Sequence, residues 1–244
     1  MLREGIAAAP RILTVRRRER LFYLGMAVVI LITVFAGFSR SYFLKAQFGT
    51  PPLSFLLHVH GLVFTSWILL FLTQTSLVAA RRTDIHRRLG VFGAVLAALL
   101  LILGTATAII RVKAGSAPIP GVPPLAFLAI PFFDMVVFAI LVGGAFYYRH
   151  RANVHKRLMT LATIALLSAP IARLPFEFMK LGPPAFFGLT DLFILALVAY
   201  DLATWKHIHP ATLWGGLLIV ASQPLRLALS GTTAWLAFAG WLTR

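Results

Sequence analysis

Two of the seven histidines lie in the same eight-residue phrase, which occurs at residues 82–89 and again at residues 151–158. Its pattern is Arg-x-(Asp/Asn)-(Ile/Val)-His-(Arg/Lys)-Arg-Leu, so His86 and His155 each stand directly before two cations. Neutral imidazoles ligate haem iron, so two such histidines on neighbouring helices would be the axial ligands of one b-type haem. A helix N-terminus beside Arg and Lys also suits a lipid phosphate, a quinone-like carbonyl or haem propionates. The phrase therefore predicts a cofactor site or an anion site.

A third basic turn carries His207 and His209, with Asp201 shortly before them in the chain. These residues complete a predicted inner layer, and His207 and His209 join the predicted cofactor-binding set. A structural interpretation also fits the repeated phrase, because Asp84 and Asn153 are residue types that cap helix N-termini by accepting a hydrogen bond from a first-turn amide. In that interpretation the phrase marks two helix starts and places positive charge beside them.

A predicted outer layer contains His58, His60, Asp134 and Asp191. Together they would form a nitrogen-and-oxygen site of the kind that iron, manganese or zinc accepts. On a regular helix, positions i and i+2 point about 200° apart, so His58 and His60 cannot chelate one ion together. A metal here would use one of these histidines with the two aspartates.

Four further polar residues belong to the same outer layer. An unpaired charge in hydrocarbon costs at least about 2.5 kcal/mol, so such residues are expected to face the bundle interior and find partners. One interpretation is a structural network, for example Asp191 with an arginine, and the other is a pocket that opens to the outer face. The four residues are Arg173, Glu177, Gln223 and Arg226.

The elements that must position these residues are membrane helices. The chain has 244 residues, of which 59% are hydrophobic and only 12% charged, whereas soluble proteins average about 25% charged. Crossing a hydrocarbon core of about 30 Å takes about 20 apolar residues as a helix, and the runs lack the alternation of barrel strands. We predict an all-α integral membrane protein with seven transmembrane helices at 21–38, 53–80, 89–110, 125–148, 158–174, 185–204 and 211–230.

The net charge of +16 reflects membrane topology rather than nucleic-acid binding. Fifteen of the 23 Lys and Arg residues lie in the N-terminal tail or in alternate turns, and the other eight lie elsewhere. Such an excess is the positive-inside pattern, so we predict a cytoplasmic N-terminus and an external C-terminus. The expected location is the bacterial inner membrane.

The two copies of the phrase are 69 residues apart, the length of one helical hairpin with its connection. We therefore predict one lone helix followed by two or three hairpins in parallel repeat. The connections on the other side are rich in proline and glycine, as at residues 118–124, and leave no room for a soluble domain.

The ends of the chain have separate interpretations. Residues 1–20 form a predicted basic cytoplasmic tail whose cations meet anionic lipid headgroups, and residues 21–244 form a single transmembrane domain. Segment 232–243, with two tryptophans, either extends the last helix or lies at the membrane interface. The absence of cysteine excludes thiolate ligands and iron–sulfur clusters.

The phrases around His58–Gly61, Ile85–Gly90, Val154–Met159 and His209–Pro210 resemble those of bacterial multi-pass inner-membrane proteins known only as an uncharacterised family. This similarity covers nearly the whole chain. A more distant resemblance is to b561-type membrane cytochromes and to the membrane factors of haem-copper oxidase maturation. It implies histidines near helix ends that hold haem or metal, although the b561 pattern has paired histidines at both faces and this chain offers Asp134 at one of those positions.

Three functions follow as hypotheses. The protein binds haem b or a divalent metal for electron transfer or respiratory-complex assembly; it is a transporter or binds a proton or small solute at its outer pocket; or it is a structural accessory protein. Neither a nucleotide-binding glycine loop nor a HExxH helix occurs, so soluble-enzyme chemistry is not expected. The bilayer is the only partner that the sequence indicates.

Overall fold

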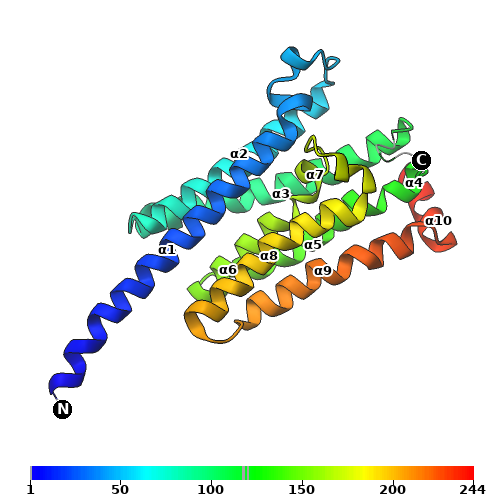
Figure 1. The fold of residues 1–244 in the computed structure, drawn as a ribbon. Coiled ribbons are helices and arrows are strands. Elements are labelled where there is room, and N and C mark those ends of the chain that lie inside the picture. The colour runs from blue at the N-terminus through cyan, green and yellow to red at the C-terminus, as the bar shows by residue number, and fades with distance from the viewer. Residues whose placement is uncertain (1, 117–118, 120) are drawn as a thin grey trace.

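The computed structural model describes residues 2–116, 119 and 121–244, with side chains from Arg17 onward. This part of the chain is a bundle of helices with no strand (Figure 1). The elements are α1 (Leu2–Phe38), η1 (Ser39–Phe43), η2 (Lys45–Phe48), α2 (Phe55–Ala79), α3 (Thr83–Lys113), α4 (Pro124–Phe127), α5 (Ala129–Tyr147), α6 (Ala152–Ala165), α7 (Ser168–Ile171), η3 (Glu177–Leu181), α8 (Pro183–Trp205), α9 (Pro210–Ser230) and α10 (Thr233–Leu242).

Six helical segments of the described chain are long and apolar enough to cross a membrane. They coincide with six of the predicted spans, and they indicate an integral membrane protein. Many large apolar side chains on these helices are exposed rather than packed, for example Phe55 and Val91, as expected where lipid replaces water as the solvent. The six segments are Arg17–Phe43, Phe55–Ala79, Thr83–Lys113, Pro124–Tyr147, Pro183–Trp205 and Pro210–Ser230.

The seventh predicted span, 158–174, is not one helix, and this prediction is corrected. Helix α6 ends at Ala165, a turn follows at Leu166 and Leu167, and the short helix α7 contains Pro170. Proline has no N–H to donate to the carbonyl four residues earlier, and its ring clashes with that carbonyl, so a regular helix is interrupted there. The interruption places Ser168 at the start of α7, facing the polar interior described below.

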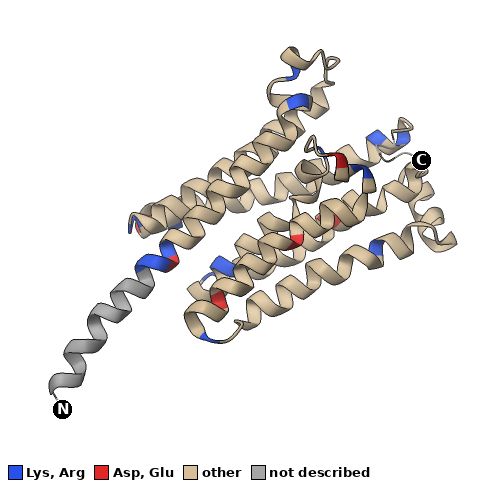
Figure 2. Ribbon diagram, viewed as in Figure 1, with Lys and Arg blue, Asp and Glu red and all other residues tan. Residues whose placement is uncertain are grey.

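The bundle has two distinct ends, which are visible in Figure 1. The end that carries the α2–α3, α5–α6 and α8–α9 turns is called the turn end, and the opposite end, with η1, η2, η3 and α10, is called the loop end. Lys and Arg residues occur at both ends of the bundle (Figure 2). The prediction that the turn end is cytoplasmic stays a prediction, as do the predicted basic tail and the parallel repeat.

Helix α6 is largely buried and packs against α5 and α9, whereas α2 packs on α1 and α3. One very close approach joins α1 to α7: a Cβ at Gly37 would stand 2.1 Å from the backbone oxygen of Pro170, so only glycine fits there. The core runs along the bundle through residues such as Trp67, Phe138 and Leu161. The indole Nε1 of Trp67 donates to Thr163 Oγ1 at 3.3 Å and so ties α2 to α6.

Segment 232–243 does not continue α9. A new helix, α10, begins after Thr232, whose side chain accepts a hydrogen bond from the backbone N–H of Trp235. With 10 residues, α10 is too short to cross a membrane by itself. It packs on α4, and the indole of Trp235 donates to the Leu125 carbonyl at 2.9 Å.

Candidate functional site

The repeated phrase begins a helix in both places, two residues earlier than the predicted N-caps place it. Helices α3 and α6 follow Arg82 and Arg151, neither of which makes a side-chain cap. The predicted N-caps Asp84 and Asn153 are therefore wrong, because both residues already lie inside the first turn. Asp84 lies 3.6 Å from the Nε of Arg82, and Asn153 Oδ1 accepts from Lys156 Nζ at 2.7 Å.

His86 and His155 come together at the turn end. Their ring centres are 6.3 Å apart, and the two rings are nearly perpendicular, at 80°. Nδ1 of His155 is 2.8 Å from the Ala145 carbonyl oxygen, which holds one edge of this ring and leaves Nε2 for another partner. Nδ1 of His86 is buried and has no hydrogen-bond partner in the described part of the chain. The pair is half-buried at the rim of the bundle.

The other two histidines of the predicted cofactor set do not join this pair in a visible site. His209 is the N-cap of α9, and its Nδ1 accepts from the Ala211 N–H at 3.1 Å. Burial lowers the pKa of His209, and the charges of Arg157, Lys156 and His207 lower it further, while Asp201 raises it. The neutral ring that this pKa favours is the form that can accept the capping bond. His207 is exposed in the same turn.

Asp201 is the centre of a buried ion-pair network at the turn end. Arg157 pairs with it through Nη2 and Nε, and their side chains are 1% and 0% exposed. Thr212 Oγ1 donates to Asp201 Oδ2 at 2.6 Å, and the His209 backbone N–H donates to the same oxygen at 3.1 Å. Nη1 of Arg157 donates to the Asn153 carbonyl at 3.0 Å. Helices α6, α8 and α9 are thereby joined through one carboxylate, which is called the Asp201 network.

A second buried pair lies nearer the loop end, between Asp134 of α5 and Arg226 of α9. Ser168 Oγ donates to Asp134 Oδ2 at 2.9 Å. Arg226 also donates to Ser222, to its carbonyl at 3.1 Å and to its Oγ at 2.6 Å, and its guanidinium lies 5.3 Å from the centre of the Phe187 ring. The charge and the N–H donors of Arg226 are thus largely satisfied within the protein. This cluster of Asp134, Ser168, Ser222 and Arg226 is called the Asp134 network.

The remaining predicted outer residues are divided among separate contacts. Asp191 accepts a hydrogen bond from Gln223 Nε2 at 2.7 Å, not from an arginine. Arg173 donates to the Ala169 carbonyl at 2.6 Å and lies over the Phe38 ring. Glu177 pairs with Lys180 in exposed helix η3. Arg173 and Glu177 are exposed and make only these local contacts, and the partner of Asp191 is Gln223 rather than an arginine.

The predicted metal ligands are not gathered. In the described ranges, no three His, Asp or Glu side chains come together in a way that could hold a metal ion. His60 stacks on Phe64 with ring centres 4.2 Å apart, and the backbone carbonyl of His58 accepts from Tyr42 at 3.2 Å. Asp134 is already paired with Arg226. No described contact connects these histidines with the aspartates.

Sequence reasoning missed several members of both networks. Arg157 was noticed only as one cation of the repeated phrase, and Ser168 and Thr212 were not considered. Lys156, also in the phrase, pairs with Glu19 of α1 and lies over the Tyr23 ring. The sequence did contain one signal for the Asp201 network, namely Asp201 itself. A carboxylate within a membrane helix requires a cation at a similar depth.

Comparison with known proteins adds no relative: no family model, no curated protein and no solved structure matches this chain.

Proposed function

We propose that this integral membrane protein binds one haem of the b type between His86 and His155 and serves one-electron transfer. The observation that supports this proposal is the close pair of imidazoles, whose ring centres are 6.3 Å apart and whose planes are nearly perpendicular. Two metal–nitrogen bonds of about 2 Å each, added to the two ring radii, span roughly 6 Å between ring centres. The separation would therefore allow both histidines to hold the iron of one haem.

The number of protein donors favours haem over a bare metal ion. A zinc or manganese site built from side chains needs three or four of them, and no such group occurs in the described residues. A haem brings four nitrogens of its own, so two histidines complete its coordination. The inner histidine pair meets that requirement, and the predicted outer set of His58, His60, Asp134 and Asp191 does not.

The residues around His86 and His155 also fit a haem. The Ala145 carbonyl accepts from His155 Nδ1, which fixes the ring and its tautomer as backbone carbonyls do for metal-bound histidines. Gly90 lies one turn after His86 on the same side of α3, and a Cβ there would meet no atom within 4 Å. Arg87 and Arg88 are exposed beside the pair and would attract propionates. When bound, haem supplies a reversible one-electron couple; the chain holds, orients and partly shields it.

The Asp134 network supports a structural role for the outer polar layer rather than transport. Asp134 and Asp191 both have partners within the described chain, so neither presents a free carboxylate to a solute. Such pairs hold helices in register because removing one partner leaves a charge buried alone. We therefore assign these residues to the stability of the bundle.

Absorption spectroscopy of the full chain, produced with ample haem and purified in detergent, tests the haem proposal. We expect a Soret band that is lost in both His86→Ala and His155→Ala. The matched control is His150→Ala, because His150 is an exposed histidine of the same turn, only five residues before His155. Size-exclusion profiles of all variants separate loss of haem from loss of fold. A colourless wild-type protein, or a Soret band that persists in His86→Ala or in His155→Ala, would overturn the proposal.

A further inference from the structure

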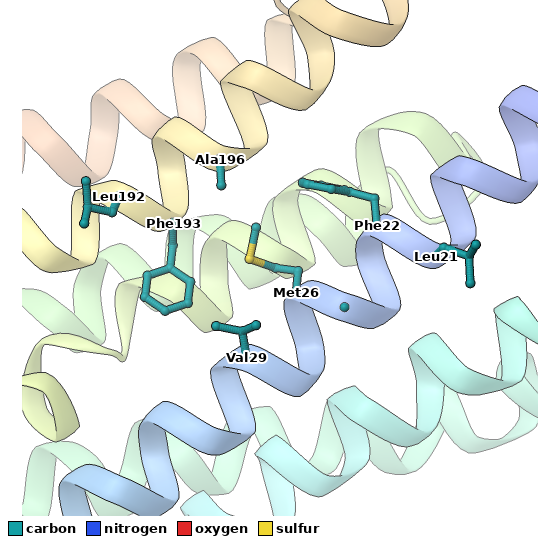
Figure 3. Close-up of a pocket in the computed structure, with 8 residues that line it drawn as sticks. Leu21, Phe22, Met26, Val29, Leu192, Phe193 and Ala196 are labelled. Atoms are coloured by element: carbon teal, nitrogen blue, oxygen red, sulfur yellow. The ribbon is translucent and has the colours of Figure 1, made fainter.

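An apolar groove lies between α1 and α8 on the side of the bundle, and the haem proposal makes no use of it (Figure 3). Its volume is about 450 Å³. Met26 and Val29 of α1 face Phe193 and Ala196 of α8 across it, as the close-up shows. Every lining residue is uncharged and apolar: Leu21, Phe22, Gly25, Met26, Val29, Leu192, Phe193 and Ala196.

The groove follows the length of α1. Its lining residues from Leu21 to Val29 cover about 12 Å of helix at ~1.5 Å per residue, a length suited to a hydrocarbon chain lying parallel to the helices. Gly25 forms part of its wall, and a Cβ at this position would meet no atom within 4 Å. The apolar wall would exclude a polar solute, because such a solute would lose its hydrogen bonds with water and gain none.

Positive charge lies at one end of the groove. The rings of Phe22 and Tyr200 stack with centres 4.1 Å apart and close the groove towards the turn end. One turn earlier on the same face of α1 stand Arg17 and Arg18, which are exposed and form no ion pair in the described chain. The nearby acid Glu19 is paired with Lys156 and so does not neutralise them.

We propose that this groove is a binding site for an anionic phospholipid, with one acyl chain between α1 and α8 and the phosphate at Arg17 and Arg18. The apolar wall matches the acyl chain, and the two exposed cations match the headgroup charge, so both parts of the ligand find complementary surfaces. Cations just outside a membrane span attract anionic lipid in this way. A neutral lipid would gain only the acyl-chain contacts.

Native mass spectrometry of the full chain in detergent, titrated with phosphatidylglycerol or phosphatidylcholine, tests the site. We expect tighter binding of phosphatidylglycerol by the wild type. Gly25→Leu places a side chain in the groove at a position where a Cβ would meet no atom within 4 Å, and it should weaken binding of phosphatidylglycerol at least about tenfold, the effect of losing roughly two buried methylene contacts. Arg17→Gln with Arg18→Gln should reduce the preference for the anionic lipid by about fivefold per cation.

Matched controls exist on other helices. Gly143→Leu of α5 also adds a side chain where a Cβ would meet no atom within 4 Å, and Arg149→Gln with Arg151→Gln removes two exposed cations of the α5–α6 turn. Both controls should bind phosphatidylglycerol as the wild type does. Equal binding of the two lipids by the wild type would overturn the proposal, as would unchanged binding in Gly25→Leu. A dimer that Gly25→Leu dissociates, with no lipid effect, would assign the groove to a second copy of the chain instead.

Discussion

The two copies of the repeated phrase begin helices with nearly the same residues, yet their last cations have opposite environments. Arg88 of the first copy is exposed, whereas its counterpart Arg157 is fully buried against Asp201. Arg87 is exposed, whereas its counterpart Lys156 is half-buried against Glu19. The difference comes from position in the bundle: α6 packs against α5, α8 and α9, while the main neighbours of α3 are α2 and α5.

The comparison shows that a shared local sequence does not imply a shared role. In the first copy the cations are available to solvent, lipid or a cofactor. In the second they stabilise the fold, because a buried arginine that lacks its carboxylate would keep the full cost of desolvation. Only the histidines of the two copies, His86 and His155, come together at one place.

The largest expected difference between the copies concerns their second cations. Arg157→Ala removes the arginine that pairs with Asp201 and leaves the carboxylate buried. It should therefore lower the free energy of unfolding by about 3–5 kcal/mol. Arg88→Ala, at an exposed position, should change it by less than about 0.5 kcal/mol. Denaturant unfolding in detergent micelles measures both.

A double variant sharpens this result. Arg157→Met with Asp201→Leu removes both charges, so it should be more stable than Arg157→Ala alone. If Arg88→Ala and Arg157→Ala lowered the free energy of unfolding equally, the two copies of the phrase would be equivalent.

A smaller difference is expected for the first cations. The side chains of Lys156 and Glu19 are 23% and 19% exposed, so screening by solvent weakens their pair. Lys156→Met should therefore destabilise the protein by about 1 kcal/mol or less, and Arg87→Met should have no measurable effect. High salt should reduce the loss for Lys156→Met if the pair is electrostatic. If Lys156→Met lowered the free energy of unfolding as much as Arg157→Ala, the expected order of the two effects would be wrong.

The smallest effect concerns the third basic turn and its pH dependence. The pKa of His209 in the folded protein is lowered below its ordinary value of about 6.5, so the unfolded chain takes up a proton first as the pH falls. Stability from this residue is therefore present above about pH 6.5 and is lost as the pH falls through the folded pKa. Protonation also removes Nδ1 as the acceptor for Ala211.

Melting temperatures between pH 8 and pH 5 measure this effect. His209→Asn keeps a capping side chain but no titration, so the fall in stability on acidification should be smaller than in the wild type. His207→Asn removes only the smallest of the charges that lower the pKa of His209, so it should reduce the pH dependence less than His209→Asn does. The prediction fails if His209→Asn and the wild type lose the same stability on acidification.

Much of the helical architecture could be predicted from the sequence. Long apolar runs must become helices in a membrane because only a helix satisfies its own backbone, and six of the predicted spans agree with the structure. The seventh prediction failed at Pro170, since hydropathy does not register a missing N–H. The prediction that Asp84 and Asn153 are N-caps was wrong, because residue type alone does not determine at which residue a helix begins.

The candidate site was predictable only in part. The repeated phrase identified His86 and His155 because identical residues recurred at equivalent places. It could not show that Arg157 would face Asp201, or that Asp134 would pair with Arg226 rather than ligate a metal. Those partners are 44 and 92 residues apart in the chain. Their pairing depends on how whole helices are arranged.

The sequence by itself determined that the chain is helical and apolar, and where its polar residues stand along each helix, because backbone hydrogen bonding in lipid is a local requirement. The tertiary structure alone decided which helix each polar group faces. That choice depends on packing among α5, α6, α8 and α9, where burial makes an unpaired charge costly and so selects the arrangement in which Arg157 meets Asp201 and Arg226 meets Asp134.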